Sequence, residues 1–379
     1  MIQRLVDALE PVREVWVKPG AEPRIIRAIT YILLGFGLIA VFSASTVESL
    51  NVHGNAWYIF FKQFLFASVG VVAMMLSDRF SITTIRQLTR VGMVVALGLL
   101  VAVLVIGTAV NGQKNWIPLG PFSVQPSEFA KLAVVLFTAQ RVAVTLRRTD
   151  DPMELFKTIF GPFVIVMVLV LAEKDMGNVL VLGGIMVAMM FAVGVPMRWI
   201  GSVTALGFVG FVGYLFIGPS YRRDRILSWL NPYADPEGNG WQWIHGNYAL
   251  ALGGLLGQGP GASKEKWGAL PEAHTDFILA VVGEEYGFVG TLVTLMLLFA
   301  LIALLIRVAM QTRDPFKRLV LVGIASWVLM QVMFNVGAVV GALPIVGVTL
   351  PLVSYGGSSL LPMLVGLGIA AQCTKATSR

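Results

Sequence analysis

Long uninterrupted runs of apolar residues dominate the chain. Stretches such as ILLGFGLIAVF and LVTLMLLFALIALLI show none of the alternation of a half-buried strand. Each belongs to a segment of about 20 residues, the length that an α-helix needs to cross a bilayer, whereas a transmembrane β-barrel would show alternating segments of about ten residues. The pattern predicts an all-α polytopic membrane protein with about ten transmembrane helices. The expected helices cover residues 25–44, 58–77, 91–110, 126–144, 159–173, 178–196, 199–217, 277–306, 319–341 and 351–373.

The composition agrees with a membrane protein and excludes several other classes. Of the 379 residues, 56% are hydrophobic and 13% are charged, whereas a water-soluble domain typically has about 25% charged residues. Residues 1–24 lack the apolar core of a cleavable signal peptide. The single cysteine, Cys373, excludes an internal disulfide and a cysteine metal cluster.

The distribution of basic residues predicts the topology. The net charge is +7, and most Lys and Arg residues fall in the connections on one side of the expected helices. Such an excess marks the cytoplasmic side, so we expect both termini in the cytoplasm, in agreement with an even number of helices. Topology then accounts for most of the excess charge, and no nucleic-acid partner is expected. The basic residues of the opposite side and of the helix mouths are Lys62, Lys114, Lys131, Lys174, Arg222, Arg223, Arg225, Lys264 and Lys266.

One long region between the expected seventh and eighth helices does not resemble a membrane segment. Over residues 218–276 the chain is rich in Gly, Pro, Asn, Trp and charged residues, and its tryptophans suit a lipid–water interface. We therefore expect a cytoplasmic N-terminal segment over residues 1–24 and a transmembrane domain over 25–373. The region 218–276 is then a large extracytoplasmic loop of that domain, and residues 374–379 are a cytoplasmic tail.

Two predicted helix starts carry polar residues that could line a cavity inside the bundle. In NGQKNWIPLGPFSVQPSEFAKL, Pro126 suits a first helical turn, and Glu128 and Lys131 share one helix face because they are three residues apart. They form either a local ion pair at a helix start or an ion pair that lines a polar cavity. In LAEKDMGN, Asp175 is either an N-cap residue or a carboxylate that faces the same cavity.

The expected outer loop begins with a dense basic cluster. The stretch YRRDRI places Arg222, Arg223 and Arg225 near the membrane surface, on the side where positive charge is normally scarce. These arginines either contact lipid phosphates or bind a specific anionic group such as a pyrophosphate.

The stretch LPEAHTDFILAVVGEEYG places Asp276 at the mouth of the expected eighth helix, although ionisable groups in lipid are costly. At about 100° per residue, the small residues at positions 280, 283, 287 and 290 lie on the side of Asp276. This stripe serves either close helix packing or a groove for a lipid tail below the carboxylate. His274 either tunes Asp276 or forms a hydrogen bond within the loop.

Four stretches together resemble one known family. QPSEFAK, NPYADPEGNGWQ, LPEAHTDFILAVVGEEYG and GVTLPLVSYGGSS are long and lie within a region that runs from Phe42 to the end of the last expected helix. They resemble the SEDS proteins (shape, elongation, division and sporulation), which include FtsW and RodA, and PEAHTDF and TLPLVSYGGSS look more like the FtsW type. The resemblance implies a bacterial peptidoglycan glycosyltransferase that polymerises lipid II at the outer face of the cytoplasmic membrane, in cell division or cell-shape maintenance.

The resemblance also implies roles for individual residues. Asp276 matches the essential aspartate of the HTDF motif, Glu128 and Lys131 match the glutamate and lysine of QPSE..K, and Asp175 matches the aspartate of PDLG. The expected partner is a class B penicillin-binding protein, which supplies transpeptidase activity, with other division or elongation proteins. The expected substrates are lipid II and a glycan linked to undecaprenyl pyrophosphate.

These substrates assign a chemistry to the candidate residues. Asp276 is then the candidate general base for the 4-hydroxyl of the acceptor sugar. The leaving undecaprenyl pyrophosphate is already charged, so it needs electrostatic stabilisation and no general acid. The arginine cluster, Lys131 or a divalent cation (Mg²⁺ or Mn²⁺) could supply this stabilisation, and Asp276 could hold such a metal together with a phosphate.

The sequence departs from the family pattern at three places. EKDMG stands where QPDLG is usual, which puts Lys174 in place of proline. His245 and Gly246 replace a Gln-Ser pair, and Asn115 replaces an arginine, with Lys114 beside it. These departures bear on substrate contacts and not on Asp276.

Two other functions stay open at this point. A transporter that flips lipid II would also use polar groups inside a helix bundle. Transporters often carry internal repeats and interrupted helices, which the sequence does not show, and the polar clusters here lie toward one face. A non-catalytic scaffold that recruits the transpeptidase would not require Asp276 at all.

Overall fold

The computed structural model describes residues 20–110, 112–120, 122–217 and 220–375. Each of the ten predicted segments overlaps one long helix. The long helices are α2 (Glu22–His53), α3 (Tyr58–Ser77), α4 (Ile82–Ile106), α5 (Pro126–Thr145), α6 (Pro152–Ala172), α7 (Met176–Ala192), α8 (Met197–Ile217), α11 (Ile278–Gln311), α12 (Pro315–Val339) and α13 (Gly357–Thr374). The shorter elements are β1 (Thr108–Val110), β2 (Gln113–Leu119), β3 (Phe122–Val124), α9 (Ser220–Leu230), the 3-10 helix η2 (Pro232–Ala234), α10 (Trp241–Gly253) and the 3-10 helix η3 (Glu265–Trp267).

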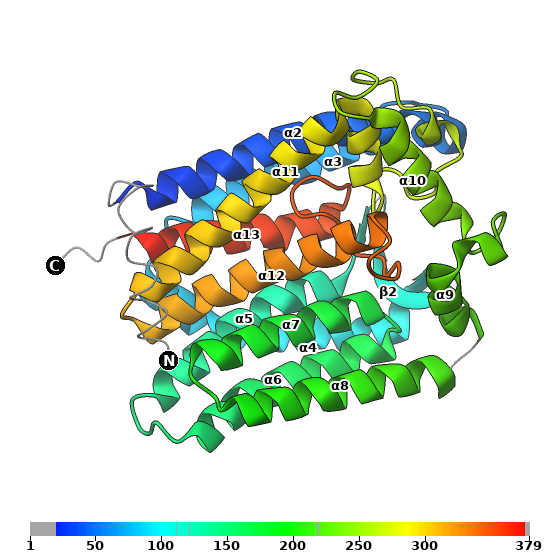
Figure 1. The fold of residues 1–379 in the computed structure, drawn as a ribbon. Helices are drawn as coiled ribbons and strands as arrows, with labels where there is room; N and C mark the ends of the chain where they lie inside the picture. Colours follow the sequence, from blue (N-terminus) through cyan, green and yellow to red (C-terminus); the bar gives the residue numbers. More distant parts are fainter. Residues whose placement is uncertain (1–19, 111, 121, 218–219, 376–379) are drawn as a thin grey trace.

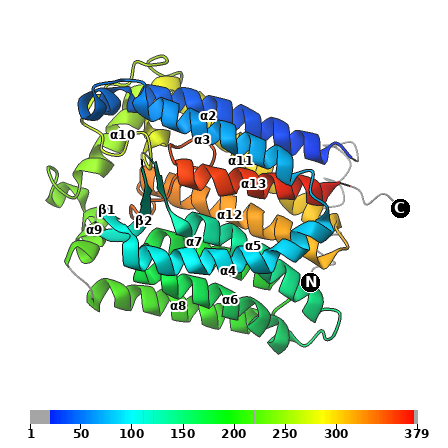
Figure 2. The same ribbon diagram turned by 180° about the vertical axis from the view of Figure 1, so that it is seen from behind.

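The long helices lie side by side in a single bundle (Figures 1 and 2). α2 begins and α13 ends at the same end of the bundle, called the terminal end below. α9, α10 and the small sheet lie at the opposite end, called the loop end below. α12 and α13 occupy the interior, because about two thirds or more of their apolar windows are buried, 67% and 72%. This arrangement agrees with the prediction that both ends of the membrane domain lie on one side.

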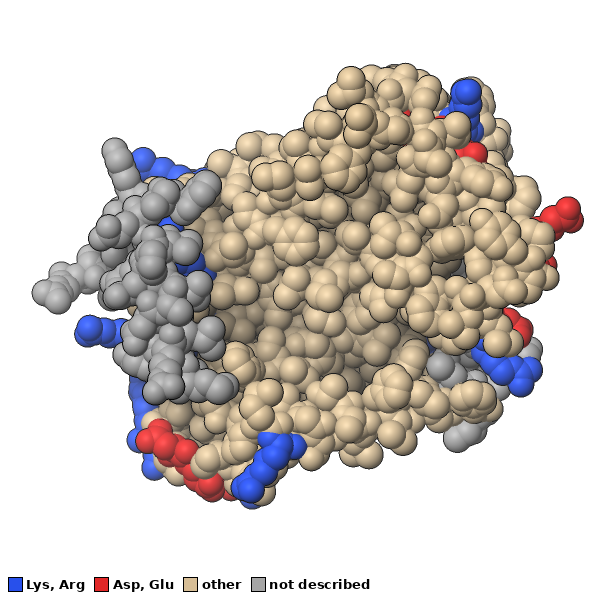
Figure 3. Space-filling model, in the orientation of Figure 1, with Lys and Arg blue, Asp and Glu red and all other residues tan. Residues whose placement is uncertain are grey.

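The outside of the bundle suits lipid. Among the described helices, seven are long and apolar enough to cross a membrane, namely α2, α3, α4, α6, α11, α12 and α13, and α7 is apolar but shorter. Large apolar side chains such as Val72, Val94 and Met296 are more than half exposed. Figure 3 shows a face that is uncharged across its middle, with Lys, Arg, Asp and Glu at the two ends. An apolar band between two charged rims is typical of a multi-pass membrane protein, and the chain is one.

A small sheet at the loop end differs from the all-α prediction. The expected helix over 91–110 instead ends at Ile106, and β1 then pairs with β2, and β2 with β3, in antiparallel order. Val110 pairs with Gln113 around the Asn-Gly dipeptide, and Gly112 has a φ of 77°. Asn-Gly is the strongest short-range sequence signal for a β-hairpin turn. The sequence therefore indicates this turn, although the sheet as a whole was not predicted.

The last helix also begins later than predicted. Residues 351–356 of the expected segment 351–373 form turns, and α13 begins at Gly357. These turns continue the irregular segment that follows α12, so residues 340–356 together form one connection, called the α12–α13 loop below. Leu352 has a φ of 66° in this loop, a conformation that does not continue a helix.

About half of the predicted outer loop is helical, with α9, η2, α10 and η3 between Ser220 and Trp267. α10 packs along α11. A side chain at Gly253 would collide with the carbonyl oxygen of Gly283, and one at Gly283 would collide with Leu250. Gly283 therefore serves close helix packing, which was one of the two interpretations of the small residues after Asp276.

α11 consists of two parts that differ in their surroundings. Gly287 interrupts the helix with a φ of 68° and a ψ of −167°, a conformation that essentially only glycine adopts. Residues 278–285 before this break are buried, whereas Phe288 and Val289 directly after it are 59% and 48% exposed. The stripe projected from Asp276 along one straight helix is therefore wrong in geometry, since the helix begins at Ile278 and breaks at Gly287.

Candidate active site at the loop end

Asp276 lies in the turn that leads into α11, where its backbone is fixed from α12. The side-chain Nδ2 of Asn335 donates to the carbonyl oxygen of Asp276 at 2.7 Å and to that of Val348 at 2.8 Å. A Cβ placed on Gly347 would lie 3.5 Å from Oδ2 of Asp276, so the α12–α13 loop passes close to this carboxylate. Asp276 is partly exposed, which leaves it accessible from the loop end.

His274 connects the same turn to α2 and to the α12–α13 loop. Its Nδ1 lies 3.2 Å from Oε2 of Glu48, which is within ion-pair distance. Its carbonyl oxygen accepts a hydrogen bond from the backbone N–H of Tyr355 at 2.9 Å, and the two rings are 5.3 Å apart. His274 is buried, so these contacts hold the turn two residues before Asp276.

Glu284 and Glu285 anchor the preceding loop onto α11. Glu284 accepts hydrogen bonds from Oγ of Ser263 at 2.5 Å and from the backbone N–H of Lys264 at 2.7 Å. Oε1 of Glu285 lies 2.9 Å from Nζ of Lys266. Both carboxylates are buried, and buried charges of this kind are tolerated because they are paired and hydrogen-bonded.

Glu128 and Lys131 form the predicted pair on one face of α5. Nζ of Lys131 lies 2.7 Å from Oε1 of Glu128 and donates to Oδ1 of Asn178 at 2.7 Å. It also lies 5.2 Å from the ring centre of Trp327, within the range of a cation–π contact. Lys131 is 0% exposed and Glu128 is 4% exposed, so the pair is enclosed between α5, α7 and α12.

Asp175 is an N-cap, as in the first of its two interpretations, and it also belongs to the buried cluster of Glu128 and Lys131. Its Oδ1 accepts from the backbone N–H of Asn178 and caps α7. Its Oδ2 accepts from Nε2 of Gln125 at 2.7 Å, from Nδ2 of Asn178 at 2.9 Å and from Nδ2 of Asn115 at 3.2 Å. Asn178 therefore links Asp175 to Lys131.

The α12–α13 loop lies between this cluster and Asp276. A side chain at Gly177, two residues after the α7 N-cap, would collide with the carbonyl oxygen of Val346. Gly347, the next residue of the loop, faces the carboxylate of Asp276. Thus one short loop segment lies against both the start of α7 and the turn of Asp276.

The arginine cluster stays a prediction. Arg223 is exposed on α9, and the side chains of Arg222 and Arg225 lie outside the part of the chain that is described. Lys114 is engaged elsewhere, since its Nζ donates to the carbonyl oxygens of Leu104 and Val105 at the end of α4, where a cation suits a helix C-terminus.

The departures from the family pattern have local explanations. Lys174 has a φ of 65°, whereas proline is fixed near about −65°, so the turn between α6 and α7 has a backbone that proline cannot adopt. Asn115 replaces an arginine and binds Asp175. His245 pairs with Glu265 at 2.6 Å, and a side chain at Gly246 would collide with the ring of Phe277.

Sequence reasoning missed three buried polar residues near the site, namely Asn178, Asn335 and Glu173. The first two are ordinary amides within apolar helices, and only the fold shows what they join. Glu173 follows the last residue of α6, outside the membrane-spanning helix, and is 0% exposed. Among the described residues neither carboxyl oxygen has a hydrogen-bond partner. Burial, and to a smaller extent the neighbouring charge of Asp175, raise the pKa of Glu173 to about 9.

We expect Glu173→Gln to stabilise the protein at neutral and alkaline pH. The unfolded carboxyl has a pKa of 4.5 and the folded one a pKa of about 9. Below the lower value both states hold the proton; between the two values the unfolded state releases it, so stability falls as pH rises. The variant should therefore melt several degrees higher near pH 8 and lose less stability between about pH 5 and pH 9 than the wild type.

The measurement is thermal unfolding of the purified protein in detergent at a series of pH values. Glu154→Gln is the matched control, because Glu154 is a half-exposed carboxylate in the first turn of α6, the helix that Glu173 follows, and its ion pair with Lys157 contributes little. It should leave the pH dependence unchanged. Equal pH dependence in the wild type and Glu173→Gln would contradict the buried, protonated carboxyl.

Comparison with known proteins identifies the family. The family model for FtsW, RodA and SpoVE, described as cell cycle protein, matches residues 24–379. Stage V sporulation protein E of Bacillus subtilis (strain 168) is 40% identical over 349 residues, which cover 90% of this chain and 93% of that protein. A protein named probable peptidoglycan glycosyltransferase FtsW, from Trichlorobacter lovleyi, is 39% identical over 345 residues, which cover 89% of each.

Solved structures share the fold. A chain from a study of how a peptidoglycan synthase complex coordinates polymerization and crosslinking has a TM-score of 0.75 and 27% identity, over 92% of this chain and 96% of that one. The rod shape determining protein RodA of Thermus thermophilus has a TM-score of 0.68 and 27% identity, over 93% and 97% of the two chains. Sequence and fold thus agree over nearly the whole length, and the chain belongs to the SEDS family of FtsW, RodA and SpoVE proteins.

Proposed function

We propose that this protein is a peptidoglycan glycosyltransferase that polymerises lipid II at the outer face of the bacterial cytoplasmic membrane. Family membership and the names of its FtsW relatives support this activity. The observation that carries it is the partly exposed carboxylate of Asp276, which is held in a fixed turn at the loop end. The curated relatives that carry the name FtsW, at 36% and 39% identity, support a role of the division type.

Asp276 acts as the general base of the reaction. Its carboxylate takes the proton of the acceptor's 4-hydroxyl as that oxygen forms a bond to the anomeric carbon of the lipid-linked glycan. The bond from the anomeric carbon to the phosphate oxygen breaks, and undecaprenyl pyrophosphate leaves with the bonding electrons. A single displacement inverts the configuration at the anomeric carbon, as in inverting glycosidases.

The buried cluster of Glu128, Lys131 and Asp175 positions the site. Lys131 is fully buried and already engaged by Glu128 and Asn178. Its role is therefore to hold α5 and α7 in the arrangement on which the α12–α13 loop rests. The pyrophosphate is stabilised by arginines of α9, of which Arg223 is exposed toward solvent.

A divalent cation is a further proposed component. Among the described residues, no group of three or more His, Cys, Asp or Glu side chains is arranged to hold a metal ion. A Mg²⁺ or Mn²⁺ ion would therefore use Asp276 together with oxygens of the pyrophosphate, and it would supply charge stabilisation to the leaving group.

The distribution of charges supports the proposed orientation. The terminal end carries basic residues from several helix ends, including Arg27 and Lys375, which both pair with Asp78, and Arg86, which pairs with Asp314. By the positive-inside rule this end faces the cytoplasm, so both termini are cytoplasmic and the loop end faces outward. Asp276 then lies on the side where the sugar head of lipid II is displayed.

The proposed partner is a class B penicillin-binding protein, with other division or elongation proteins around it. A complex that coordinates polymerization and crosslinking contains a chain of this fold, which supports such a partnership here. α9 and α10 extend from the loop end (Figure 1) and are the described elements that an outer domain of the partner would meet first.

The test is polymerisation of purified lipid II by the purified chain in detergent, with and without the partner. We expect glycan polymers that a muramidase digests to disaccharides. Detergent abolishes the two compartments that a flippase needs, so a flippase would give no polymer. A scaffold would likewise give none with the chain alone, and polymer formation only by the partner would overturn the proposal.

A further inference from the structure

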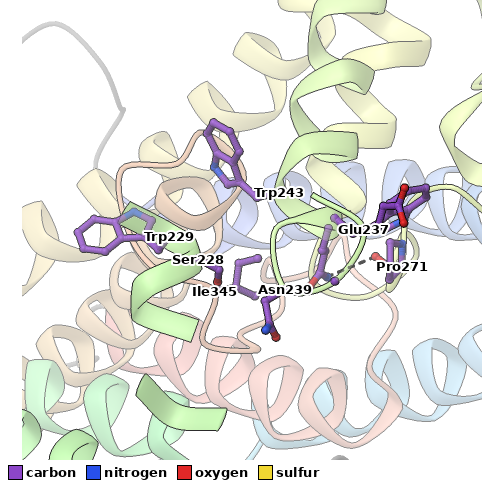
Figure 4. A pocket seen from close by; sticks show the side chains of 10 residues that line it. Ser228, Trp229, Glu237, Asn239, Trp243, Pro271 and Ile345 are labelled. Carbon is purple, nitrogen blue, oxygen red and sulfur yellow. Dashed lines mark hydrogen bonds between the residues drawn. The ribbon is translucent and has the colours of Figure 1, made fainter. Parts of the chain in front are cut away.

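A cavity of about 490 Å³ opens at the loop end, between α9, the start of α10 and the α12–α13 loop (Figure 4). Its volume lies within the range of small-molecule sites, about 300–1,000 Å³. Three of the chain's nine tryptophans line it, Trp229 from α9 and Trp241 and Trp243 from α10. We call it the Trp cavity. The mechanism proposed above gives it no role.

Two of the three indole rings of the Trp cavity, those of Trp229 and Trp241, are held by hydrogen bonds of their own N–H groups. Nε1 of Trp229 donates to the carbonyl oxygen of Gly341 at 2.9 Å, and Nε1 of Trp241 donates to that of Ala269 at 2.5 Å. Nε1 of Trp243 is buried and has no hydrogen-bond partner among the described residues. Rings fixed in this way offer rigid apolar faces at a low cost in conformational entropy.

Polar side chains also line the Trp cavity. Asn239 and Gln242 provide amide groups, and the exposed Glu237 provides a carboxylate. Nε2 of Gln242 donates to the carbonyl oxygen of Pro271 at 3.3 Å, near the limit of a hydrogen bond, so this amide is only weakly held. Amides and carboxylates offer both donors and acceptors to hydroxyl groups.

The aromatic rings and the polar groups of the Trp cavity together favour a saccharide as the ligand. A sugar ring has apolar C–H faces, which pack on aromatic rings, and hydroxyls at its rim, which bond to amides and carboxylates. The charged side chain among the described lining residues is the carboxylate of Glu237, which attracts hydroxyl donors and repels an anionic ligand. A lipid tail would leave the amides and the carboxylate unsatisfied.

The Trp cavity is connected to the candidate active site through two short pieces of chain. Pro271 lines the cavity and is five residues before Asp276, so their Cα atoms lie at most about 18 Å apart. Ile345 lines it as well and is two residues before Gly347, which faces the carboxylate of Asp276. A saccharide chain of a few rings could therefore occupy both places at once.

We propose that the Trp cavity is a saccharide subsite that holds sugar rings of the growing glycan strand while its end is at Asp276. The proposal rests on the proposed glycosyltransferase function and adds where the polymer is held. Such a subsite keeps the product bound between additions, so it raises the length of the strands made per binding event.

The direct test is binding of a peptide-free GlcNAc–MurNAc tetrasaccharide to the full chain in nanodiscs, followed by saturation-transfer NMR. We expect the wild type and Asp276→Asn to bind it and Trp229→Ala to bind it about tenfold or more weakly, since one aromatic contact is lost. Trp229→Phe keeps a ring without the N–H and should retain most of the binding, which separates stacking from misfolding. Trp267→Ala is the matched control, because Trp267 is 72% exposed and lies outside the cavity lining.

The second measurement is the length of glycan made from lipid II. Trp229→Ala should give strands several-fold shorter than those of the wild type, and Trp267→Ala should give wild-type lengths.

Equal tetrasaccharide binding by the wild type and Trp229→Ala, or binding only when the sugars carry their peptides, would overturn the subsite. If the wild type binds the tetrasaccharide at Trp229 but makes no polymer, the subsite stands and the proposed function fails. Polymerisation without any tetrasaccharide binding would support the proposed function and overturn the subsite.

Discussion

Asp276→Asn should reduce lipid II polymerisation by at least about a hundredfold, because the amide keeps the size of the carboxylate but cannot accept the hydroxyl proton, and general bases contribute roughly 10²–10⁴-fold. The backbone carbonyl of Asp276, which binds Asn335, is unaffected by the change. The variant should therefore keep the melting temperature of the wild type. The measurement is the initial rate of polymer formation, with thermal unfolding in parallel.

Glu272→Gln is the matched control for this change. Glu272 is an exposed carboxylate in the same turn, and its Oε2 accepts from the hydroxyl of Thr275. The same substitution of oxygen by nitrogen four residues away should leave the rate within about twofold, since a surface substitution of this kind has little effect. A rate above about 10% of wild type in Asp276→Asn would contradict proton abstraction by this residue.

Lys131→Met should destabilise the protein strongly and reduce its activity. Removing the ammonium leaves Glu128 buried and without its ion pair, and loss of one partner of a buried pair costs about 3–5 kcal/mol. Asn178 loses a donor as well. We expect the melting temperature and the polymerisation rate to fall together, with both measured on detergent-purified protein.

The double variant Glu128→Leu with Lys131→Met separates stability from function. Replacing a whole buried pair by apolar side chains of similar size is often neutral for stability, so this variant should recover most of the stability that Lys131→Met loses. If the pair positions the active site, polymerisation stays low in the double variant. Recovery of wild-type turnover along with stability would remove Glu128 and Lys131 from the site.

The sequence was sufficient for the helices because their apolar runs extend over a full membrane crossing, and no soluble alternative accommodates such runs. It was less informative where short elements depend on partners far away in the chain. The sheet at the loop end has strands of three and seven residues, and only the Asn-Gly dipeptide marks it locally. The late start of α13 depends on the packing of the α12–α13 loop, which no local pattern encodes.

The types of residue in the candidate site could be predicted from the sequence, but the hydrogen bonds that connect them could not. Spacing alone placed Glu128 and Lys131 on one helix face, and the structure pairs them. The links from this pair to Asp175 through Asn178, and from Asp276 to α12 through Asn335, join positions 47 and 59 residues apart. An amide in an apolar helix gives no indication of which distant backbone it binds, so these links required the fold.

The break in α11 has a consequence for where the reaction lies relative to the lipid. The part after Gly287 covers residues 288–311, about 36 Å of helix, close to the roughly 30 Å of a hydrocarbon core. Its outward apolar side chains begin at Phe288, so the acyl chains reach up to that level. The part before the break, Ile278 to Glu285, is buried in the protein and does not contact the acyl chains, so the turn of Asp276 is separated from the lipid-facing part of α11 by the break at Gly287. The sugars of a lipid-linked substrate would meet the carboxylate there, while its polyprenyl tail stays in the bilayer.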